Sequence, residues 1–262
     1  MPILSSLKPL AHAETHSIEG KDPIIIAQNG VNWAISEFYV NRPGNRYGSG
    51  SLSYDHDPNT KSEYILSNDD NSGDPYRLRE SMEDLEDYTN ANGMITWTSS
   101  GKPFARINDV RLFFKFKLDT TSNLRTYLGF ANYTYLDEMD FIFPDNAGND
   151  WLNNKKGIAN YNTSDNGNFR IGYNEGTGAT NFTSALDTLD TDWHTLYIEA
   201  DETNSRWGYS FDKSNMSWIS SSEVPDSTDR LALISWIEST ENVNKAFYIS
   251  YIRTAMKMGI TI

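Results

Sequence analysis

The chain has 262 residues, of which 38% are hydrophobic and 13% aromatic, enough to bury a sizeable core. Its formal net charge of −14 argues against a nucleic-acid-binding surface, which needs clustered Lys and Arg to neutralise phosphates. The absence of cysteine excludes disulfides, thiolate metal sites and cysteine nucleophiles. The start of the chain lacks the apolar core of a signal peptide, and no run approaches the roughly 20 apolar residues of a membrane span. We therefore expect neither nucleic-acid binding nor membrane insertion.

Residues 1–30 are predicted to form an extended arm. They sustain no period of 2 or 3.6, and the Asp-Pro step at residues 22–23 disfavours a helix. Ile24, Ile25 and Ile26 follow this step, and they can be buried against a partner when the arm docks. We therefore expect two parts, an arm over 1–30 and a β-sandwich over 31–262.

The arm contains the stretch HAETHSIEGKDPI, residues 12–24. It resembles a short motif in the N-terminal parts of tail-fibre, head-fibre and other appendage proteins of bacterial and archaeal viruses. Glu19 departs from the motif, because the family usually has a second glycine there. The resemblance implies an arm that anchors on other virion proteins, through His12, Thr15, His16, Gly20, Asp22, Pro23, Ile24, Ile25 and Ile26. The two histidines are either solvated polar residues or a ring around the axis of a homo-oligomer, where they could hold a metal.

Residues 31 to about 100 mix short strand-like runs with dense turn signals, as sandwich edges or long loops do. One short helix is predicted inside this region, over DPYRLRESMEDLEDYTNANG at residues 74–93. The signals are a capping Asp, a Pro at the first helical position, an apolar stripe and a terminating Gly. They are Asp74, Pro75, Leu78, Met82, Leu85 and Gly93.

From about residue 104 the chain alternates apolar and polar residues in short runs separated by turn formers. In RLFFKFKL, residues 111–118, one face is apolar and the other carries the basic residues. The same alternation recurs in NFRIGYN, RWGYSF and RLALISWI, and the tail AMKMGITI predicts a last strand paired inside a sheet. We predict an all-β fold, an antiparallel two-sheet jelly-roll sandwich with an extended arm and one short helix.

The stretch TDWHTLYIEADETNSRWGYSFD, residues 191–212, resembles a late strand pair of the concanavalin A-like (laminin G-like) jelly-roll family. The resemblance extends over roughly residues 100–262 and implies two antiparallel sheets, often with a carbohydrate-binding face or rim, and sometimes a structural calcium. Alternation places His194 on the side of Leu196 and Ile198, which predicts a satisfied, partly buried histidine. No other histidine is near it in sequence, so a catalytic dyad has no visible partner.

Some proteins of that fold are glycoside hydrolases, and retaining hydrolysis needs two carboxyl groups about 5 Å apart. In those hydrolases the pair comes from one strand, as Glu-x-Asp-x-Glu or with one further residue before the last Glu. Residues 135–146, YLDEMDFIFPDN, begin this pattern with Glu138 and Asp140. Ile142 and Phe143 stand where the second glutamate would fall. We therefore predict no catalytic residues and no enzyme activity.

PDNAGNDW, residues 144–151, is the candidate ligand-binding loop. Asp145, Asn149 and Asp150 offer oxygen ligands of the type that calcium prefers, and Trp151 offers a ring that can stack on a sugar. Such residues also crowd ordinary turns, and their spacing does not match an EF-hand. We predict no cofactor and no metal site, with calcium at this loop as the alternative.

Two functions of different classes fit the sequence. The first is a virion appendage or surface protein, a homo-oligomer whose arm anchors a lectin-like sandwich that faces outward and binds a host surface glycan. The second is a cellular or secreted carbohydrate-binding module or degenerate glycoside hydrolase. The arm motif and the missing signal peptide favour the first. A capsid decoration without a ligand is a third function that the sequence does not separate from the first.

Overall fold

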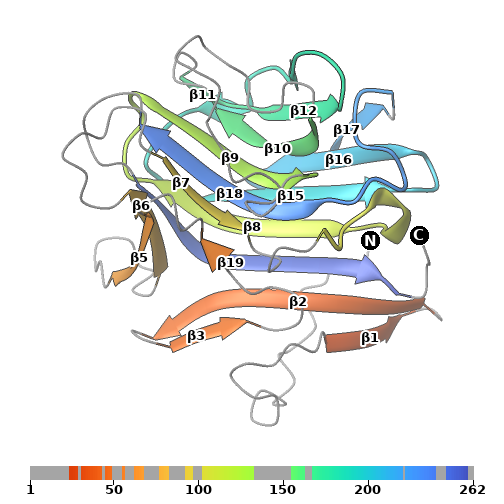
Figure 1. Cartoon of the computed structure of the whole chain (residues 1–262), viewed down its shortest axis with the longest axis horizontal. Coiled ribbons are helices and arrows are strands. Elements are labelled where there is room, and N and C mark those ends of the chain that lie inside the picture. Colours follow the sequence, from red (N-terminus) through yellow and green to blue (C-terminus); the bar gives the residue numbers. More distant parts are fainter. Residues whose placement is uncertain are drawn as a thin grey trace.

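Antiparallel β-sheets make up most of the described part of the protein (Figure 1). The structure is a computed structural model, which describes residues 24–28, 31–42, 45–48, 55–56, 62–67, 77–82, 92–96, 102–132, 155–162, 167–220, 222–239 and 246–258. Its side chains are described at residues 33–35 and, from residue 102 onward, at all of these except 236–239 and 246–247.

The larger sheet has ten strands in the order β1-β2-β19-β8-β15-β16-β17, with β3 paired to β2 and β6 joining β5 to β19. Its strands are β1 (Ile24–Gln28), β2 (Val31–Arg42), β3 (Asn45–Gly48), β5 (Ser62–Ser67), β6 (Arg77–Met82), β8 (Arg111–Leu118), β15 (His194–Asp201), β16 (Arg206–Phe211), β17 (Ser217–Ser220) and β19 (Ala246–Lys257). The chain's last described strand therefore lies in the middle of this sheet, as the sequence predicts.

The second sheet has seven strands in the order β13-β12-β10-β9-β18-β7-β4. They are β4 (Asp55–His56), β7 (Asn92–Thr96), β9 (Leu124–Ala131), β10 (Lys156–Asn162), β12 (Ile171–Glu175), β13 (Asn181–Phe182) and β18 (Ala232–Ser239). A small ladder joins β11 (Asn168–Phe169) to β14 (Asp187–Thr188).

The core lies between the two sheets, and the strand alternation seen in the sequence produces it. In β8 and β15 every second residue is buried, and these residues pack against apolar side chains of β9, β10 and β18. Trp207, Phe114 and Phe130 are among the largest fully buried side chains. Each such side chain contributes about 1.5 to 3 kcal/mol of burial free energy, so this core holds the sandwich together without a disulfide.

The seven-stranded sheet is buried on both of its faces at β9, where all eight residues are buried. Leu128 and Phe130 face the core, and Tyr127 lies on the other face beside Tyr161 of β10, with ring centroids 5.7 Å apart. Gly129 allows the backbones of β9 and β10 to lie close together at this point. A Cβ built at Gly129 would lie 2.4 Å from the carbonyl oxygen of Ile158.

The helix predicted over residues 74–93 is wrong. Residues 77–82 form β6 and residues 92–96 form β7, and within the described residues the only helical segment is a 3-10 turn, Arg106–Asn108. The helix signals are local and an isolated helix of this length is marginal, whereas β6 gains backbone pairing on two sides, with Leu78 opposite both Leu66 and Ile249. No helix among the residues that the structure describes is long and apolar enough to span a membrane.

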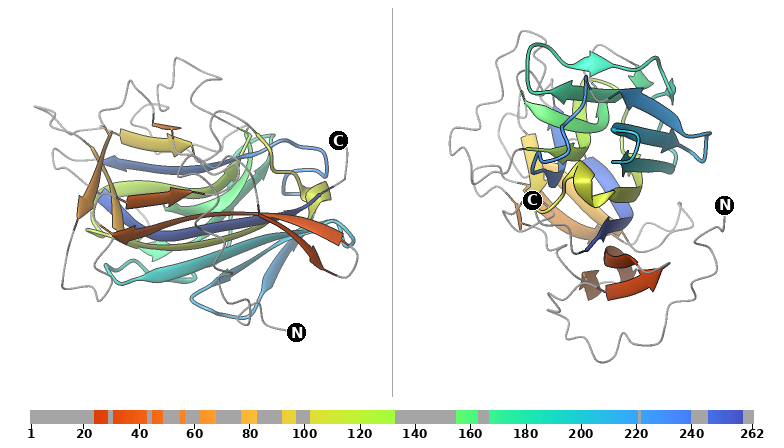
Figure 2. Two further views of the ribbon diagram at one scale, coloured as in Figure 1. Left: turned by 90° about the horizontal axis from the view of Figure 1, so that it is seen from below. Right: turned by 90° about the vertical axis from the view of Figure 1, so that its right-hand side faces the viewer.

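The predicted arm ends in a strand of the larger sheet. Ile24, Ile25 and Ile26 lie in β1, where they pair with Ile35, Ala34 and Trp33 of β2. Figure 2 (right) shows this red strand at the opposite end of the molecule from the green strands. The boundary expected at residue 30 thus falls between the two strands of a pair, and residues 1–23 lie outside the described part of the chain.

Candidate functional site

His194 is the first residue of β15 and points into the core. It lies on the same face as Leu196 and Ile198, as the alternation predicts, and only 3% of it is exposed. Aromatic rings surround the imidazole, with centroids at 4.5 Å for Phe169 and 5.0 Å for Phe211. A histidine in such apolar surroundings needs polar partners at both nitrogens.

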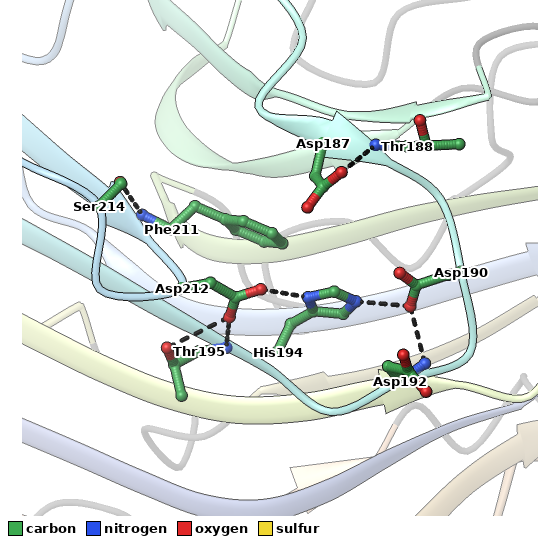
Figure 3. Close-up of polar contacts among 9 residues, drawn as sticks. All are labelled: Asp187, Thr188, Asp190, Asp192, His194, Thr195, Phe211, Asp212 and Ser214. Carbon is green, nitrogen blue, oxygen red and sulfur yellow. Dashed lines mark hydrogen bonds and ion pairs between the residues drawn. The ribbon is translucent and has the colours of Figure 1, made fainter.

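Two aspartates supply these partners from opposite sides (Figure 3). Asp212, just after β16, lies with Oδ2 2.5 Å from His194 Nδ1, and Asp190, four residues before His194, lies with Oδ1 2.8 Å from Nε2. Each carboxylate also accepts a backbone N–H, Asp212 from Thr195 at 2.6 Å and Asp190 from Asp192 at 2.7 Å. We call Asp190, His194 and Asp212 the histidine clasp.

The clasp favours the charged imidazolium. Burial alone lowers the pKa of His194, but hydrogen bonds and charge interactions with Asp212 and Asp190 outweigh it, so the pKa lies above its ordinary value of 6.5. Burial raises the pKa of Asp190, but the N–H of Asp192 and the imidazolium lower it by more. The pKa of Asp190 therefore lies below its ordinary value of 3.8. The two carboxylates therefore stabilise the protonated ring relative to the neutral one.

This geometry joins two loops and does not suit proton transfer. Both ring nitrogens are occupied, so no nitrogen faces a substrate as a general base. The two carboxylates bind opposite edges of the ring and cannot converge on one cation, and no group of three His, Asp or Glu side chains in the described segments could hold a metal. The clasp therefore fixes the segment before β15 to the turn after β16.

We predict a pH-dependent stability from the clasp. The His194 contribution is fully present below pH 6.5 and is lost as pH rises through the raised folded-state pKa, while the Asp190 contribution is lost as pH falls below about 3.8. His194→Gln should lower the free energy of unfolding at pH 6 by about 1.5 to 3 kcal/mol, the range for buried hydrogen bonds to charged groups. The deficit should shrink above pH 6.5 by at most about 1.4 kcal/mol per pH unit.

Urea unfolding between pH 5 and 9 measures this deficit. Asp187→Asn is the matched control, because Asp187 of β14 lies shortly before Asp190 and accepts the N–H of Thr188 without a bond to His194 (Figure 3). A deficit that stays constant from pH 5 to 9 would show that the pKa of His194 is the same in the folded and unfolded protein, so that the clasp does not favour the imidazolium.

The second feature is an exposed aromatic ring at the edge of the larger sheet. Among the described side chains three large apolar ones are exposed, Phe182, Trp218 and Met258. Trp218 of β17 is 37% exposed and lies over Gly208 of β16, where a Cβ would approach its ring to 2.8 Å. The absence of a side chain at Gly208 thus lets the indole lie close to the sheet while the residue stays partly exposed.

Polar groups surround this ring. The Arg206 guanidinium stacks on Trp218 at 3.9 Å from the ring centroid, and its Nε donates to Asp201 at 2.9 Å. Asn204 donates to both carboxylate oxygens of Asp201. Burial raises the pKa of Asp201, but the bonds from Asn204 and Arg206 lower it more, so it stays ionised. We call Trp218, Arg206, Asp201 and Asn204 the Trp218 platform.

Most of the site residues predicted from the sequence lie outside the described part of the chain. Asp145, Asn149, Asp150 and Trp151 lie outside the described residues, as do Glu138 and Asp140 of the incomplete hydrolase pattern. The anchoring residues 12–23 also lie outside them, and only Ile24, Ile25 and Ile26 are placed, in β1.

Sequence reasoning missed the partners of His194 and the Trp218 platform. Asp212 reaches His194 through the β15–β16 register, in which Leu196 opposes Phe211. The available signal was the alternation of RWGYSF, which indicates a strand that ends at Phe211. In an antiparallel pair the end of this strand lies beside the start of the preceding strand, so Asp212 comes close to His194. For Trp218 the signal was a glycine two residues into β16, opposite a tryptophan on a short strand.

Known structures share this architecture, although no protein-family model and no curated protein sequence matches the chain. A protein of unknown function from Shewanella oneidensis MR-1 superposes with a TM-score of 0.57 at 10% identity, covering 90% of this chain and 92% of its own. The Emp47p carbohydrate recognition domain gives 0.50 at 8% identity, covering 83% and 93%. The lectin UEA-II, solved with galactose, gives 0.49 at 11% identity, covering 84% and 98%. The likeness is one of fold: the protein is a concanavalin A-like jelly-roll sandwich.

Proposed function

We propose that this protein binds carbohydrate through the Trp218 platform and does not catalyse a reaction on it. The observation that carries the proposal is the partly exposed Trp218 ring, which lies over Gly208 and carries the Arg206 guanidinium, itself bonded to Asp201. A pyranose has an apolar face and a rim of hydroxyls. A flat indole complements the first, and a carboxylate with amide and guanidinium donors complements the second.

Two further considerations support a binding function. The fold is also that of the Emp47p carbohydrate recognition domain. The proposal of no catalysis rests on the sequence, where the hydrolase pattern at Glu138 and Asp140 lacks its second glutamate. It also agrees with the clasp, whose histidine has both nitrogens engaged.

We also propose that the protein acts on a virus particle, as a homo-oligomer that presents the sandwich to a host surface glycan. This part rests on the resemblance of residues 12–24 to viral appendage proteins. In this account residues 1–23 contact other virion proteins, and β1 connects that contact to the sandwich.

A glycan microarray tests the binding function. Wild-type protein should bind a subset of glycans, and Trp218→Ala should lose that binding with a melting temperature within a few degrees of wild type. Phe182→Ala is the control, since Phe182 is similarly exposed but lies on β13 of the other sheet, stacked on Tyr161. Equal binding by wild type and Trp218→Ala would remove the platform from the proposal.

The arm should be needed for assembly and not for folding. Deleting residues 1–23 keeps β1, so we expect a melting temperature within a few degrees of wild type and loss of incorporation into particles. Deleting residues 1–30 also removes β1 and exposes the edge of β2, which should lower solubility. Unchanged incorporation of the first truncation would refute the anchoring role, and failure of that truncation to fold would make residues 1–23 part of the core.

A further inference from the structure

The outer face of the larger sheet, away from the core, combines basic and aromatic side chains across β19, β8 and β15. Trp193 lies under two ammonium groups, Lys115 Nζ at 5.1 Å and Lys117 Nζ at 5.7 Å from its ring centroid. Lys117 Nζ also lies 5.2 Å from the ring of Tyr248 on β19. Tyr251, opposite Lys115, packs on Phe113 with ring centroids 5.8 Å apart.

The charge of this face is opposite to that of the chain. The described outward-facing side chains of β8, β15, β16 and β19 include six Lys or Arg and two acids, on a protein with a net charge of −14. They are Arg111, Lys115, Lys117, Arg206, Arg253 and Lys257, with Glu199 and Asp201. A local excess of positive charge on an acidic protein selects for an anionic ligand.

The Trp218 platform is continuous with this basic face. The pairing register places Trp218, Gly208, Glu199 and Arg111 in one row across four adjacent strands. Three strand spacings, about 14 Å, separate the backbone positions of Trp218 and Arg111 across the sheet. Along β8, Lys115 lies four residues, about 13 Å, beyond Arg111. A chain of several sugar units, and not a single one, spans this distance.

We infer that the ligand is an acidic glycan, an oligosaccharide bearing carboxylate or sulfate groups, which lies across the outer face from the Trp218 platform to Lys115 and Lys117. The inference rests on the proposed carbohydrate-binding function and names its ligand class. Sugar units pack along the exposed parts of the Trp218 and Trp193 side chains, beside the cations that lie over their rings. Lys115, Lys117 and Arg253 face the acidic groups.

The arrangement favours an acidic glycan over a nucleic acid. Three of the six cations are already matched by acids. Arg111 Nε lies 3.6 Å from Glu199, Arg206 Nε lies 2.9 Å from Asp201, and Lys257 pairs with Asp109. The face is therefore only moderately positive, which suits a polymer with about one charge per sugar or fewer. A nucleic acid, with its dense phosphates, would also be repelled by the remaining acidic surface.

Calorimetric titration of the full chain tests the inference with hexasaccharides of polymannuronate, chondroitin sulfate and maltose at low salt. We expect the acidic probes to bind at least tenfold tighter than maltohexaose. The double variant Lys115→Gln and Lys117→Gln should lose at least tenfold for the acidic probes. Lys102→Gln with Lys155→Gln, outside the strands of this face, should not. Glu199→Gln should bind the acidic probes more tightly, because it removes a negative charge from the face and keeps a side chain of the same shape.

The outcomes separate the inference from the proposed function. Equal binding of all three probes, with no effect of the Lys115 and Lys117 changes, would overturn the acidic ligand and leave carbohydrate binding in place. Binding of maltohexaose alone would do the same. If no probe binds, the inference is overturned, and the microarray decides the proposed function independently. Tighter binding of single-stranded hexathymidylate than of either acidic sugar would overturn the glycan in favour of a nucleic acid.

Discussion

Replacing Gly129 with alanine is expected to lower the free energy of unfolding by about 3 kcal/mol, the upper part of the range for overpacking a core. The added methyl would lie 2.4 Å from the Ile158 carbonyl oxygen and 2.6 Å from the Ala159 Cα. These are backbone atoms, so no side-chain rotation relieves the overlap. Strands β9 and β10 would have to separate, which breaks a pairing in the middle of the seven-stranded sheet.

Gly167→Ala is the matched control for this prediction. A Cβ at Gly167 has no atom within 4 Å, and the residue is exposed, so its change should stay within about 0.5 kcal/mol. Urea denaturation followed by circular dichroism measures both variants. Equal stability of Gly129→Ala and wild type would mean that β9 and β10 do not approach this closely.

Trp207→Ala should lower the free energy of unfolding by about 3 to 5 kcal/mol, as large-to-small changes of buried aromatic residues do. Trp207 is fully buried, packs 5.8 Å from Phe130 across the sandwich, and donates its indole N–H to the Pro225 carbonyl at 3.1 Å. The substitution leaves a cavity and an unpaired carbonyl together.

Trp218 provides the contrast on the next strand. It lies on the opposite face of the same sheet and is 37% exposed, so Trp218→Ala should cost about 1 kcal/mol or less. We therefore expect the Trp207 substitution to lower stability and the Trp218 substitution to lower binding. Similar destabilisation by both substitutions would contradict the assignment of their faces.

Strand positions in the C-terminal half could be predicted because alternation is a local property. The buried set in β8 and β15 matches the period of two read from the sequence. The helix prediction for residues 77–82 was wrong because helix signals are also local. These residues instead form β6 by pairing with β5 and with β19, and β19 is distant in sequence. Local pattern therefore fixed the class of fold but not every element.

The candidate sites were harder to predict because they depend on register. His194 was correctly expected on the buried face, but Asp212 becomes its neighbour only through the pairing of β15 with β16. Trp218 becomes exposed because β17 pairs so that Ile219 faces the core and Trp218 faces outward over Gly208. Neither relation is visible in a single segment of sequence.

The central claim is that sugar contacts the exposed part of the Trp218 side chain. Fluorine NMR of protein labelled with 5-fluorotryptophan tests this claim directly. Among the signals of the seven tryptophans, those of Trp218 and Trp207 are assigned from the variants Trp218→Phe and Trp207→Phe. Glucuronic acid and galactose are titrated to millimolar concentrations, where a single weak subsite is still occupied. We expect the Trp218 signal to shift with saturation and the buried Trp207 signal to stay in place. A Trp218 signal that does not move with either sugar, while the protein remains folded, would contradict the account.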